Sequence, residues 1–377
     1  MKEINGVYTS AVIFTDDVED YALAQIKLIC DNPIFKESKI RIMPDVHPGK
    51  YCTIGTAMTI KDKVIPYLVG VDIGCGMTCV RLKNKKAEFM QLDSVISKRV
   101  PSGMKNRRER HRFAERAGLK ELRCRHYIRE EKALLSLGTL GGGNHFIELD
   151  RGKDGTQYLI IHSGSRHLGT EVAEYYQKEA ARQRKEEGMD LPFGCAYAEG
   201  SLFEDYIHDM EIVQEFAALN RECIADEVLK GMKWKEEDRF DTVHNYISPM
   251  EEGWMLRKGA VSARNNELVL IPVSMKEGAL ICRGKGNKEW NESAPHGSGR
   301  IAGRKLTESI HTVSEFKKEM KGIYCSVIGK DTLDEAPFAY RRMDAICDRI
   351  GDTAEVMEMI RPVYNFKAGK EERRAER

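Results

Sequence analysis

Hydrophobic and polar positions follow two different periods along this chain. The N-terminal third has short, β-branched apolar runs between turn residues, such as CTIGTAMTI and KVIPYLVGVDIG, which favour buried strands over helices. Similar runs return later as HFIEL, QYLIIHSG, GAVSARNNELVLIPVSM and ALICRGKG. We therefore predict that strands dominate the first third and recur in these four later segments.

Four other stretches are predicted to be helical. Residues 171–187 and 202–232 carry apolar side chains at helical spacing, which predicts two amphipathic helices that face the core. The glycine-rich turn HGSGRIAG precedes a further predicted helix. Polar periodicity also predicts a basic helical segment over residues 105–132, which has nine Lys or Arg against three Glu between residues 105 and 125.

The strand-rich and helix-rich stretches are mixed without regular βαβ alternation, and no Pro/Ser-rich linker separates them. This organisation favours the α+β class over a doubly wound sheet. We predict a single compact domain over residues 1–377, with central β-sheets surrounded by helices and a charged tail at 368–377. The chain has neither a G-x-x-x-x-G-K-[ST] phosphate loop nor a G-x-G-x-x-G dinucleotide motif.

Composition excludes several classes of protein. The 377 residues are 41% apolar and 32% charged, which is typical of a globular chain. Lys and Arg total 60 against 59 Asp and Glu, so only local clustering could hold a polyanion. An acidic N-terminus and the lack of a long apolar run predict a cytoplasmic protein outside the membrane. Ten cysteines without a C-x-x-C pair argue against a disulfide framework or a zinc ribbon.

Several glycine-flanked segments place metal-ligand residue types where predicted strands end. If these ends converge, the side chains would supply enough ligands for one metal, or for two metals that share a thiolate. A lone histidine is more often a hydrogen-bonded core or surface residue, and periodicity does not prove convergence. The candidates are Asp72 and Cys75 in VGVDIGCGM, Asn144, His145 and Glu148 in GGGNHFIEL, His162 and His167 in LIIHSGSRH, and His244 in DTVHNYIS.

Eight motifs in this order resemble the RtcB family of RNA-splicing ligases, over residues 43–369. They are MPDVHPGKYCTIG, VGVDIGCGM, LGTLGGGNHFIEL, IHSGSRHLG, HNYIS, RKGAVSA, APHGSGR and DEAPFAYR. The resemblance implies an RtcB-like domain with its active site in a central cleft. It also implies a GTP- and manganese-dependent RNA ligase that joins 3′-phosphate or 2′,3′-cyclic phosphate ends to 5′-hydroxyl ends, in tRNA splicing or RNA repair. An archease-like activator is a further partner that the resemblance suggests.

The resemblance also assigns the metal site and the nucleophile. Cys75 is implied to bridge two Mn²⁺ ions, with Asp72 and His145 completing one ion and His162 and His244 the other. Thiolate and imidazole by themselves favour zinc or iron, so manganese rests on the resemblance. The histidine of the H-G-x-G-R motif, here His296, is implied to attack the α-phosphate of GTP and to become guanylylated. The chain has no K-x-D-G motif, which is consistent with a histidine nucleophile.

The remaining implied residues surround the nucleotide. Glu148 is expected to read guanine N–H groups, and the full set of GTP contacts is Asn144, Glu148, Ser274, Gly297, Tyr340 and Lys367. Three neighbouring positions depart from the family pattern. Ser298 stands where alanine is usual, Val273 where glycine is usual, and Pro295 where a small or sulfur-containing residue is usual. These departures could change nucleotide specificity or the rate of guanylylation.

Two other functions fit the same residues. A two-metal phosphoesterase or nuclease would use the Asp, Cys and His cluster to activate water, with His296 as a general acid or phosphate ligand. A non-catalytic RNA-binding protein would use residues 105–125 to contact phosphates, although such a basic stretch is more often a solvated face. Retention of label from GTP on the protein would separate the ligase from both.

Overall fold

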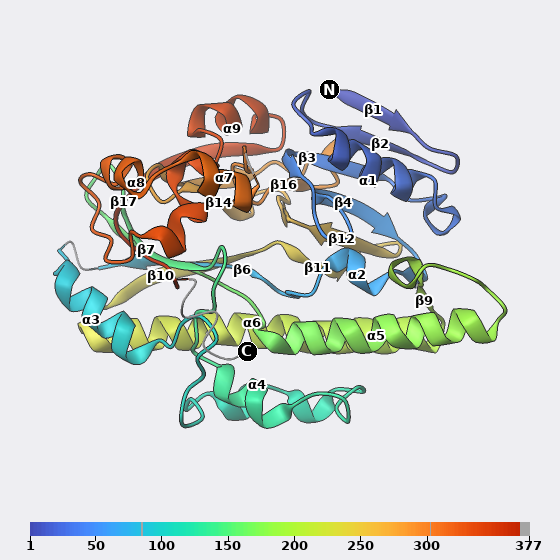
Figure 1. Cartoon of the computed structure of the whole chain (residues 1–377), viewed down its shortest axis with the longest axis horizontal. Helices are drawn as coiled ribbons and strands as arrows, with labels where there is room; N and C mark the ends of the chain where they lie inside the picture. The colour runs from blue at the N-terminus through green and yellow to red at the C-terminus, as the bar shows by residue number, and fades with distance from the viewer. Residues whose placement is uncertain (84–85, 302, 370–377) are drawn as a thin grey trace.

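Two β-sheets form the frame of the structure, a computed structural model that describes residues 1–83, 86–301 and 303–369 (Figure 1). The first sheet has six strands in the order β1-β2-β3-β4-β12-β11. All neighbouring pairs are antiparallel except β2 and β3, which are parallel. Its strands are β1 (Lys2–Asn5), β2 (Ser10–Ile13), β3 (Ile40–His47), β4 (Ile54–Ile60), β12 (Trp254–Lys258) and β11 (Asn245–Pro249).

The second sheet has seven strands, all antiparallel to their neighbours, in the order β10-β6-β8-β7-β17-β15-β14. It carries most of the motifs that the sequence analysis identified. Its strands are β10 (Glu236–Val243), β6 (Gly76–Leu82), β8 (Gln157–Ser163), β7 (Phe146–Arg151), β17 (Ala354–Phe366), β15 (Gly278–Gly284) and β14 (Leu268–Ser274). Two small ladders pair β13 (Ala260–Ser262) with β16 (Ser293–Pro295) and β5 (Lys63–Val64) with β9 (Ala198–Glu199).

The two longest helices, α5 (His167–Glu186) and α6 (Ser201–Met232), lie side by side beneath the sheets in Figure 1. The largest hydrophobic core packs side chains of both helices, including Tyr176 and Phe216, against strand residues such as Met58 of β4. A second core packs Ile224 and Val228 of α6 against β6, β7 and β8. Helix α6 therefore contacts both sheets, and its apolar side chains at helical spacing make this possible.

Shorter helices cover the remaining surfaces. They are α1 (Asp20–Cys30), α2 (Pro66–Val69), α3 (Phe89–Arg99), α4 (Glu130–Ser136), α7 (Arg304–Ile310), α8 (Val313–Glu319) and α9 (Met343–Ile350). Among the described residues, no helix has the length and apolar character needed to cross a membrane. Turns of 3₁₀ helix occupy Pro33–Phe35, Ala114–Arg116, Leu119–Glu121, Phe193–Cys195, Lys288–Trp290, Lys330–Glu335 and Pro337–Ala339.

The predicted α+β fold is confirmed, with central sheets and surrounding helices. The two amphipathic helices, the helix after HGSGRIAG and the four later strand segments are all present. The run KVIPYLVGVDIG is an exception, because it contains the short helix α2 between β5 and β6. Pro66 occupies the first turn of α2, where its missing N–H costs nothing and its fixed φ suits a helix.

The predicted basic helix over residues 105–132 is wrong. This segment is mostly irregular, with two 3₁₀ turns at Ala114–Arg116 and Leu119–Glu121, and regular helix begins only at Glu130 in α4. Gly118 has a φ of 66°, a left-handed conformation that ends a right-handed helical path. Anchoring to α6 replaces the hydrogen bonds of a helix, since two carboxylate oxygens of Asp209 accept the backbone N–H groups of Arg123 and Cys124. Of the predicted charged tail, residues 370–377 lie outside the described part of the chain.

Candidate functional site

Four neighbouring strands of the seven-stranded sheet meet at one edge, and the candidate ligands lie there. In the order β10, β6, β8, β7, each strand is antiparallel to its neighbour. The starts of β6 and β7 therefore share an edge with the ends of β10 and β8. The sequence analysis placed all candidates at strand ends, but three of them precede their strands. The five side chains at this edge are Asp72 and Cys75 before β6, His145 before β7, His162 on β8 and His244 after β10.

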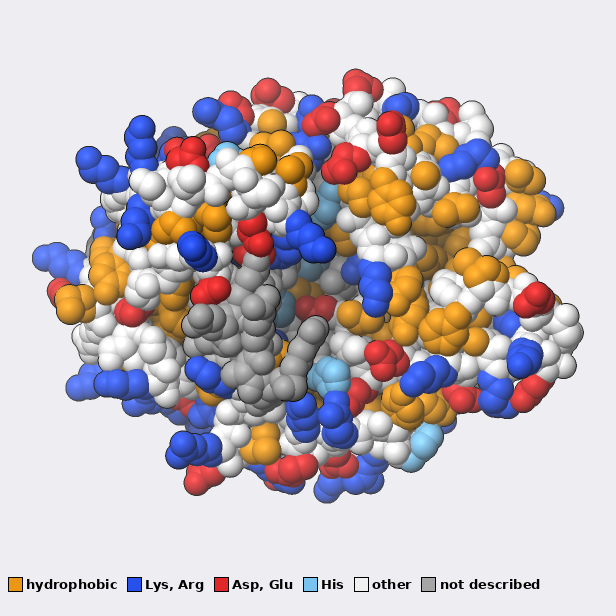
Figure 2. All heavy atoms as spheres, viewed as in Figure 1, with side chains coloured by type: hydrophobic (Ala, Val, Ile, Leu, Met, Phe, Trp, Pro, Cys, Tyr) orange, Lys and Arg blue, Asp and Glu red, His pale blue; other side chains and the backbone are white. Residues whose placement is uncertain are grey.

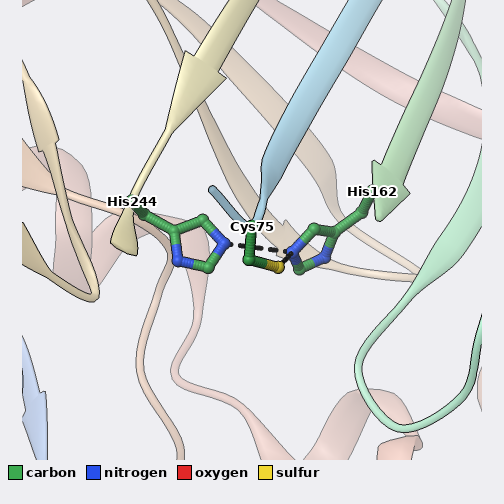
Figure 3. A group of neighbouring side chains, drawn as sticks. All are labelled: Cys75, His162 and His244. Carbon is green, nitrogen blue, oxygen red and sulfur yellow. Dashed lines mark hydrogen bonds between the residues drawn. The ribbon is translucent and has the colours of Figure 1, made fainter. Parts of the chain in front are cut away.

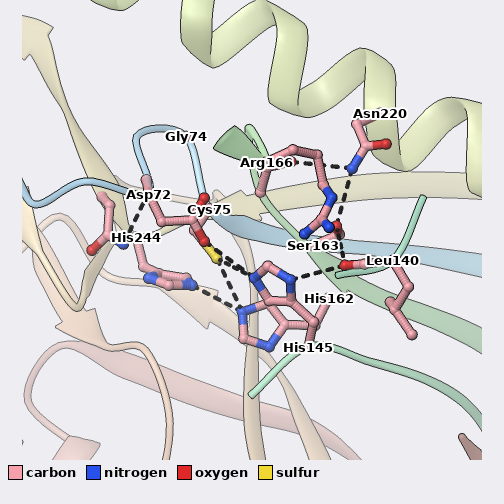
Figure 4. A network of polar contacts seen from close by, with 12 residues as sticks. Asp72, Gly74, Cys75, Leu140, His145, His162, Ser163, Arg166, Asn220 and His244 are labelled. Carbon is pink, nitrogen blue, oxygen red and sulfur yellow. Dashed lines mark hydrogen bonds and ion pairs between the residues drawn. The ribbon is translucent and has the colours of Figure 1, made fainter. Parts of the chain in front are cut away.

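These five side chains form two groups that share the Cys75 thiol (Figures 3 and 4). In the first group, Cys75 Sγ lies 3.4 Å from His162 Nε2, and the Nε2 atoms of His162 and His244 are 3.1 Å apart. In the second, Cys75 Sγ lies 3.4 Å from His145 Nε2, which is 3.1 Å from Asp72 Oδ2. Within each group the ligand atoms all lie within 4.8 Å of one another, so one cation could contact three of them.

The protonation states of the free protein also favour a cation here. Burial lowers the pKa values of His162 and His244 well below the usual range, so both rings are neutral and their nitrogens can act as ligands. Burial would raise the pKa of the Asp72 carboxyl, but the hydrogen bond with His145 and the further contacts with His145, Cys75 and Arg166 together outweigh this and lower the pKa to about 2. Burial, and then the charge of Asp72, raise the pKa of the Cys75 thiol, so a bound cation is needed to hold it as thiolate.

The arrangement therefore fits a metal ion. The Nδ1 of His145 lies 2.9 Å from the carbonyl oxygen of Leu140 and donates to it in the neutral ring. In the free protein a hydrogen bond joins His145 Nε2 and Asp72 Oδ2 at 3.1 Å, and a bound cation would take the place of that proton between the two ligand atoms. The cluster is thus consistent with metal use, whereas the role of each residue as a ligand stays a prediction.

Helix α6 fixes the loops that carry these groups (Figure 4). The side-chain amide of Asn220 donates to the hydroxyl of Ser163 at 3.0 Å and to the carbonyl of Thr139 at 3.1 Å. The fully buried Arg221 donates to the carbonyls of Gly74 and Ser163, at 3.0 and 3.1 Å. These bonds hold the turn before Cys75 and the end of β8 in register, so α6 positions ligands on both sides of the thiol.

Glycine at 164 is required by the close approach of Asp72. A Cβ atom at that position would lie 2.2 Å from Asp72 Oδ1, which is far inside van der Waals contact. Glycine flanks the segments that carry the candidate ligands, and this close contact explains that pattern at Gly164.

The predicted nucleophile lies beside the cluster. His296 follows β16, and its ring centroid is 4.8 Å from that of His244. Its Nδ1 lies 2.6 Å from Oδ2 of Asp45, which also accepts the backbone N–H of His296 at 3.1 Å. Asp45 is fully buried in β3, whereas the His296 side chain is 18% exposed. The neutral ring thus donates from Nδ1 and keeps a lone pair on Nε2.

A cavity of about 270 Å³ adjoins His296 and His162, and all six residues expected to contact the nucleotide line it. In Figure 2, histidine side chains are visible in a hollow near the middle of the face shown. The structure thus brings together the nucleotide set, Asn144, Glu148, Ser274, Gly297, Tyr340 and Lys367, in one space next to the metal-type cluster.

An ionic network fixes one wall of this cavity. Glu335, which has no exposed side-chain surface, accepts from Lys367 Nζ at 2.9 Å and from the hydroxyl of Tyr340 at 2.5 Å. Burial would raise the pKa of Glu335, but the charges of Lys367 and Arg304 lower it to about 2. Lys367 is therefore a buried, paired lysine and not a solvated surface residue.

The departures from the family pattern lie against this cavity as well. The hydroxyl of Ser298 donates to the carbonyl of Val273 at 2.9 Å, so two of the three unusual residues are bonded to each other. Both line the cavity. Pro295 ends β16 directly before His296 and pairs with Ala260 of β13.

Sequence reasoning missed several residues of the site. Asp45 lies in the quoted motif MPDVHPGK, Glu335 in DEAPFAYR, and Asn365 near the end of β17 hydrogen-bonds to Glu148. An acid inside a matched motif was the available signal for the first two. In contrast, His167 lies at the start of α5, 3.7 Å from Glu171, and belongs to neither metal-type group.

Comparison with known proteins identifies the family to which this chain belongs. Residues 25–368 match the family described as tRNA-splicing ligase RtcB. The RNA-splicing ligase RtcB of Escherichia coli (strain K12) is 31% identical over 372 residues, which cover 89% of this chain and 90% of that protein. The tRNA-splicing ligase RtcB of Pyrobaculum aerophilum is 26% identical over 449 residues, covering 94% of this chain and 92% of that protein. The motifs, the cavity and these matches together show that the chain belongs to the RtcB family of tRNA-splicing ligases.

Proposed function

We propose that this protein is an RNA ligase that joins 3′-phosphate or 2′,3′-cyclic phosphate ends to 5′-hydroxyl ends through a guanylylated His296. The observation that carries the proposal is the contact between His296 and Asp45 at the junction of the metal-type cluster and the cavity. Within this function, tRNA splicing or RNA repair is the biological setting, and an archease-like protein is a candidate activator.

The covalent step follows from the orientation of His296. Asp45 accepts a hydrogen bond from the Nδ1–H of His296, which leaves the lone pair of Nε2 to attack the α-phosphorus of GTP. A P–N bond forms, the P–O bond to the β-phosphate breaks, and pyrophosphate leaves with that electron pair. Asp45 stabilises the positive charge that develops on the ring, as the carboxylate of a catalytic triad does.

The cluster would hold two Mn²⁺ ions. Cys75 would bridge them, with Asp72 and His145 on one ion and His162 and His244 on the other. When bound, the ions would supply charge neutralisation and alignment for the phosphate oxygens. Manganese and the two-ion count come from the family resemblance, because sulfur and nitrogen ligands alone suit zinc or iron better.

The cavity residues have distinct tasks in this proposal. Lys367 and Tyr340, which Glu335 holds in place, would form the wall on one side of the nucleotide. Glu148 would accept hydrogen bonds from the guanine base. Ser274 at the end of β14, Gly297 next to His296, and Asn144 would complete the contacts.

The proposal is tested by incubating the protein with labelled GTP and Mn²⁺, and then with RNA whose ends have defined chemistry. Labelled protein followed by joined RNA supports the ligase. A metal-dependent phosphoesterase would cleave phosphate esters without retaining label, and a non-catalytic RNA-binding protein would do neither. Either of those results would overturn the proposal.

A first prediction concerns Asp45. Asp45→Asn keeps the shape of the side chain but weakens the acceptor for the His296 Nδ1 proton, so the wrong tautomer becomes available. We expect the initial rate of label uptake from GTP to fall about 10²- to 10⁴-fold, with the bound metal content unchanged. An unchanged rate would show that Asp45 does not orient the nucleophile.

Residues 105–125 remain our candidate for RNA contact. Only some of their positive charges are free of ion pairs within the described structure and so can contact phosphates. Most arginines of this segment pair with carboxylates, many of them on α6. For example, Arg116 forms two hydrogen bonds of 2.7 Å with Glu222. Arg108 and Lys120 are exposed and stand outside these pairs. We propose that these two residues contact RNA phosphates.

A second prediction follows from this difference. Replacing Arg108 and Lys120 with Gln removes two uncompensated charges, so RNA affinity should fall and the slope of log affinity against log salt should flatten by about one per residue. The matched control Arg116→Gln/Glu222→Gln removes an ion pair without changing the net charge, and should leave affinity and slope unchanged. Binding of single-stranded RNA is measured over a salt series. Equal slopes in both variants would remove this surface from the proposal.

A further inference from the structure

A pair of buried carboxyl groups lies behind the nucleotide cavity. Glu148 and Asp150 lie two residues apart on β7, so their side chains point to the same face of the sheet. Glu148 is 3% exposed and lines the cavity, whereas Asp150 is fully buried and does not. Their neighbours across β8 are Ile160 and Tyr158, which belong to an apolar cluster. Two acidic groups therefore share an apolar environment.

The two carboxyl groups lie two residues apart on the same face of β7, close enough for each to affect the ionisation of the other. In the part of the chain that the structure describes, neither oxygen of Asp150 has a donor from another residue. Two ionised carboxylates in contact inside an apolar core would repel strongly, and neither could donate to the other. A single proton between them removes the repulsion and satisfies one oxygen of each.

The surrounding groups decide which residue carries the proton. Glu148 accepts from the side-chain amide of Asn365 and lies near Lys367, and both favour its ionised form. Within the described part of the chain, the one charge that favours the ionised form of Asp150 is that of Arg361, which is exposed. Three other titratable groups nearby are Cys79 on β6, Tyr158, which is hydrogen-bonded to Glu358, and Glu335, which is paired with Lys367. None of them donates a hydrogen bond to Asp150.

The pKa directions agree with this arrangement. Burial, and then the charge of Glu148, raise the pKa of Asp150 well above its usual range. Burial also raises the pKa of Glu148, to about 7, because contacts with Asp150, Asn365 and Lys367 offset only part of that rise.

We propose that Asp150 is a positioning residue that carries the shared proton and donates it to Glu148, which keeps Glu148 ionised in the nucleotide cavity. This inference rests on the proposed use of GTP and names how the base is selected. An ionised Glu148 only accepts hydrogen bonds. It therefore favours a base whose edge presents N–H donors, as guanine does at N1 and N2, over adenine, which presents an acceptor at N1.

The test compares two substitutions of similar size. Asp150→Asn keeps an N–H donor for Glu148, whereas Asp150→Leu removes it and leaves Glu148 against an apolar side chain. In Asp150→Leu the pKa of Glu148 should rise, because the donor to its ionised form is lost. GMP is the probe, since it has no pyrophosphate to lose and cannot guanylylate the protein.

We expect Asp150→Leu to bind GMP about tenfold to a hundredfold more weakly than the wild type near neutral pH, the value of one hydrogen bond to a charged group. This loss should shrink as pH rises, because Glu148 then ionises without help. Asp150→Asn should match the wild type near neutral pH, and AMP affinity should change little in either variant. Calorimetric titration over a pH series measures these affinities. Identical GMP profiles for Asp150→Leu and Asp150→Asn would overturn the inference while leaving GTP use intact.

A second measurement does not depend on nucleotide binding and begins with the wild-type protein. Infrared spectra of wild-type protein, with and without isotope-labelled aspartate, should show the carbonyl stretch of a protonated aspartic acid at neutral pH. That band should be absent in Asp150→Asn. A wild-type protein without the band would overturn proton sharing whatever its ligand. A protein that shows the band but binds no GMP would overturn the proposed guanine selection together with the proposed function.

Discussion

His296→Ala is expected to take up no label from GTP, while its manganese content stays at the wild-type level. The imidazole Nε2 is the only atom of this residue that can form the P–N bond, and alanine offers no replacement. The five metal-type ligands do not include His296, so their cluster should persist. Protein-bound label is measured after denaturing gel separation, and metal content by mass spectrometry.

The matched control is His311→Ala, because His311 is a histidine that stacks on Phe338 and is not part of the cavity wall. That variant should be labelled as the wild type is. The wild-type adduct should be acid-labile and alkali-stable, as expected of a histidine phosphoramidate and unlike an acyl phosphate. A labelled His296→Ala protein, or a wild-type adduct that maps to another residue, would contradict the assignment.

The second large effect is expected from Cys75→Ala. The thiol is the one group common to both metal-type groups, so its loss removes a ligand from each. Because changes to supporting residues alone cost 10- to 100-fold in metal affinity, loss of this shared ligand should weaken Mn²⁺ binding by about 100-fold or more. Guanylylation should then fall below detection. Metal content after dialysis and the electron paramagnetic resonance of added Mn²⁺ measure the effect.

Cys79→Ala provides the control for this variant. Cys79 lies on β6, four residues after Cys75, is equally buried, packs in an apolar cluster, and belongs to neither metal-type group. It should lose some packing stability and keep its metal. If Cys75→Ala retains wild-type metal content, Cys75 does not bridge the ions.

The sequence by itself determined the elements with strong periodicity and the residue types of the site. Helices α5 and α6 and the strands around the motifs were predictable, because each has enough residues for its period to be clear. The sequence also identified Asp72, Cys75 and His145 as candidate ligands, because glycine lies near each of them. A tight ligand cluster needs such glycines, since they allow the backbone to approach closely.

Only the tertiary structure decided how these residues meet. His296 and Asp45 are 251 positions apart, and no local pattern links a buried acid on β3 to a histidine after β16. Arg116 and Glu222 are 106 positions apart, so a count of local charge along residues 105–125 could not reveal that most of it is neutralised. The same segment has polar spacing close to that of a helix, but its anchoring to α6 overrides that local preference. Periodicity reports which face of an element is buried, whereas long-range pairing depends on strand order and direction, which only the assembled sheets define.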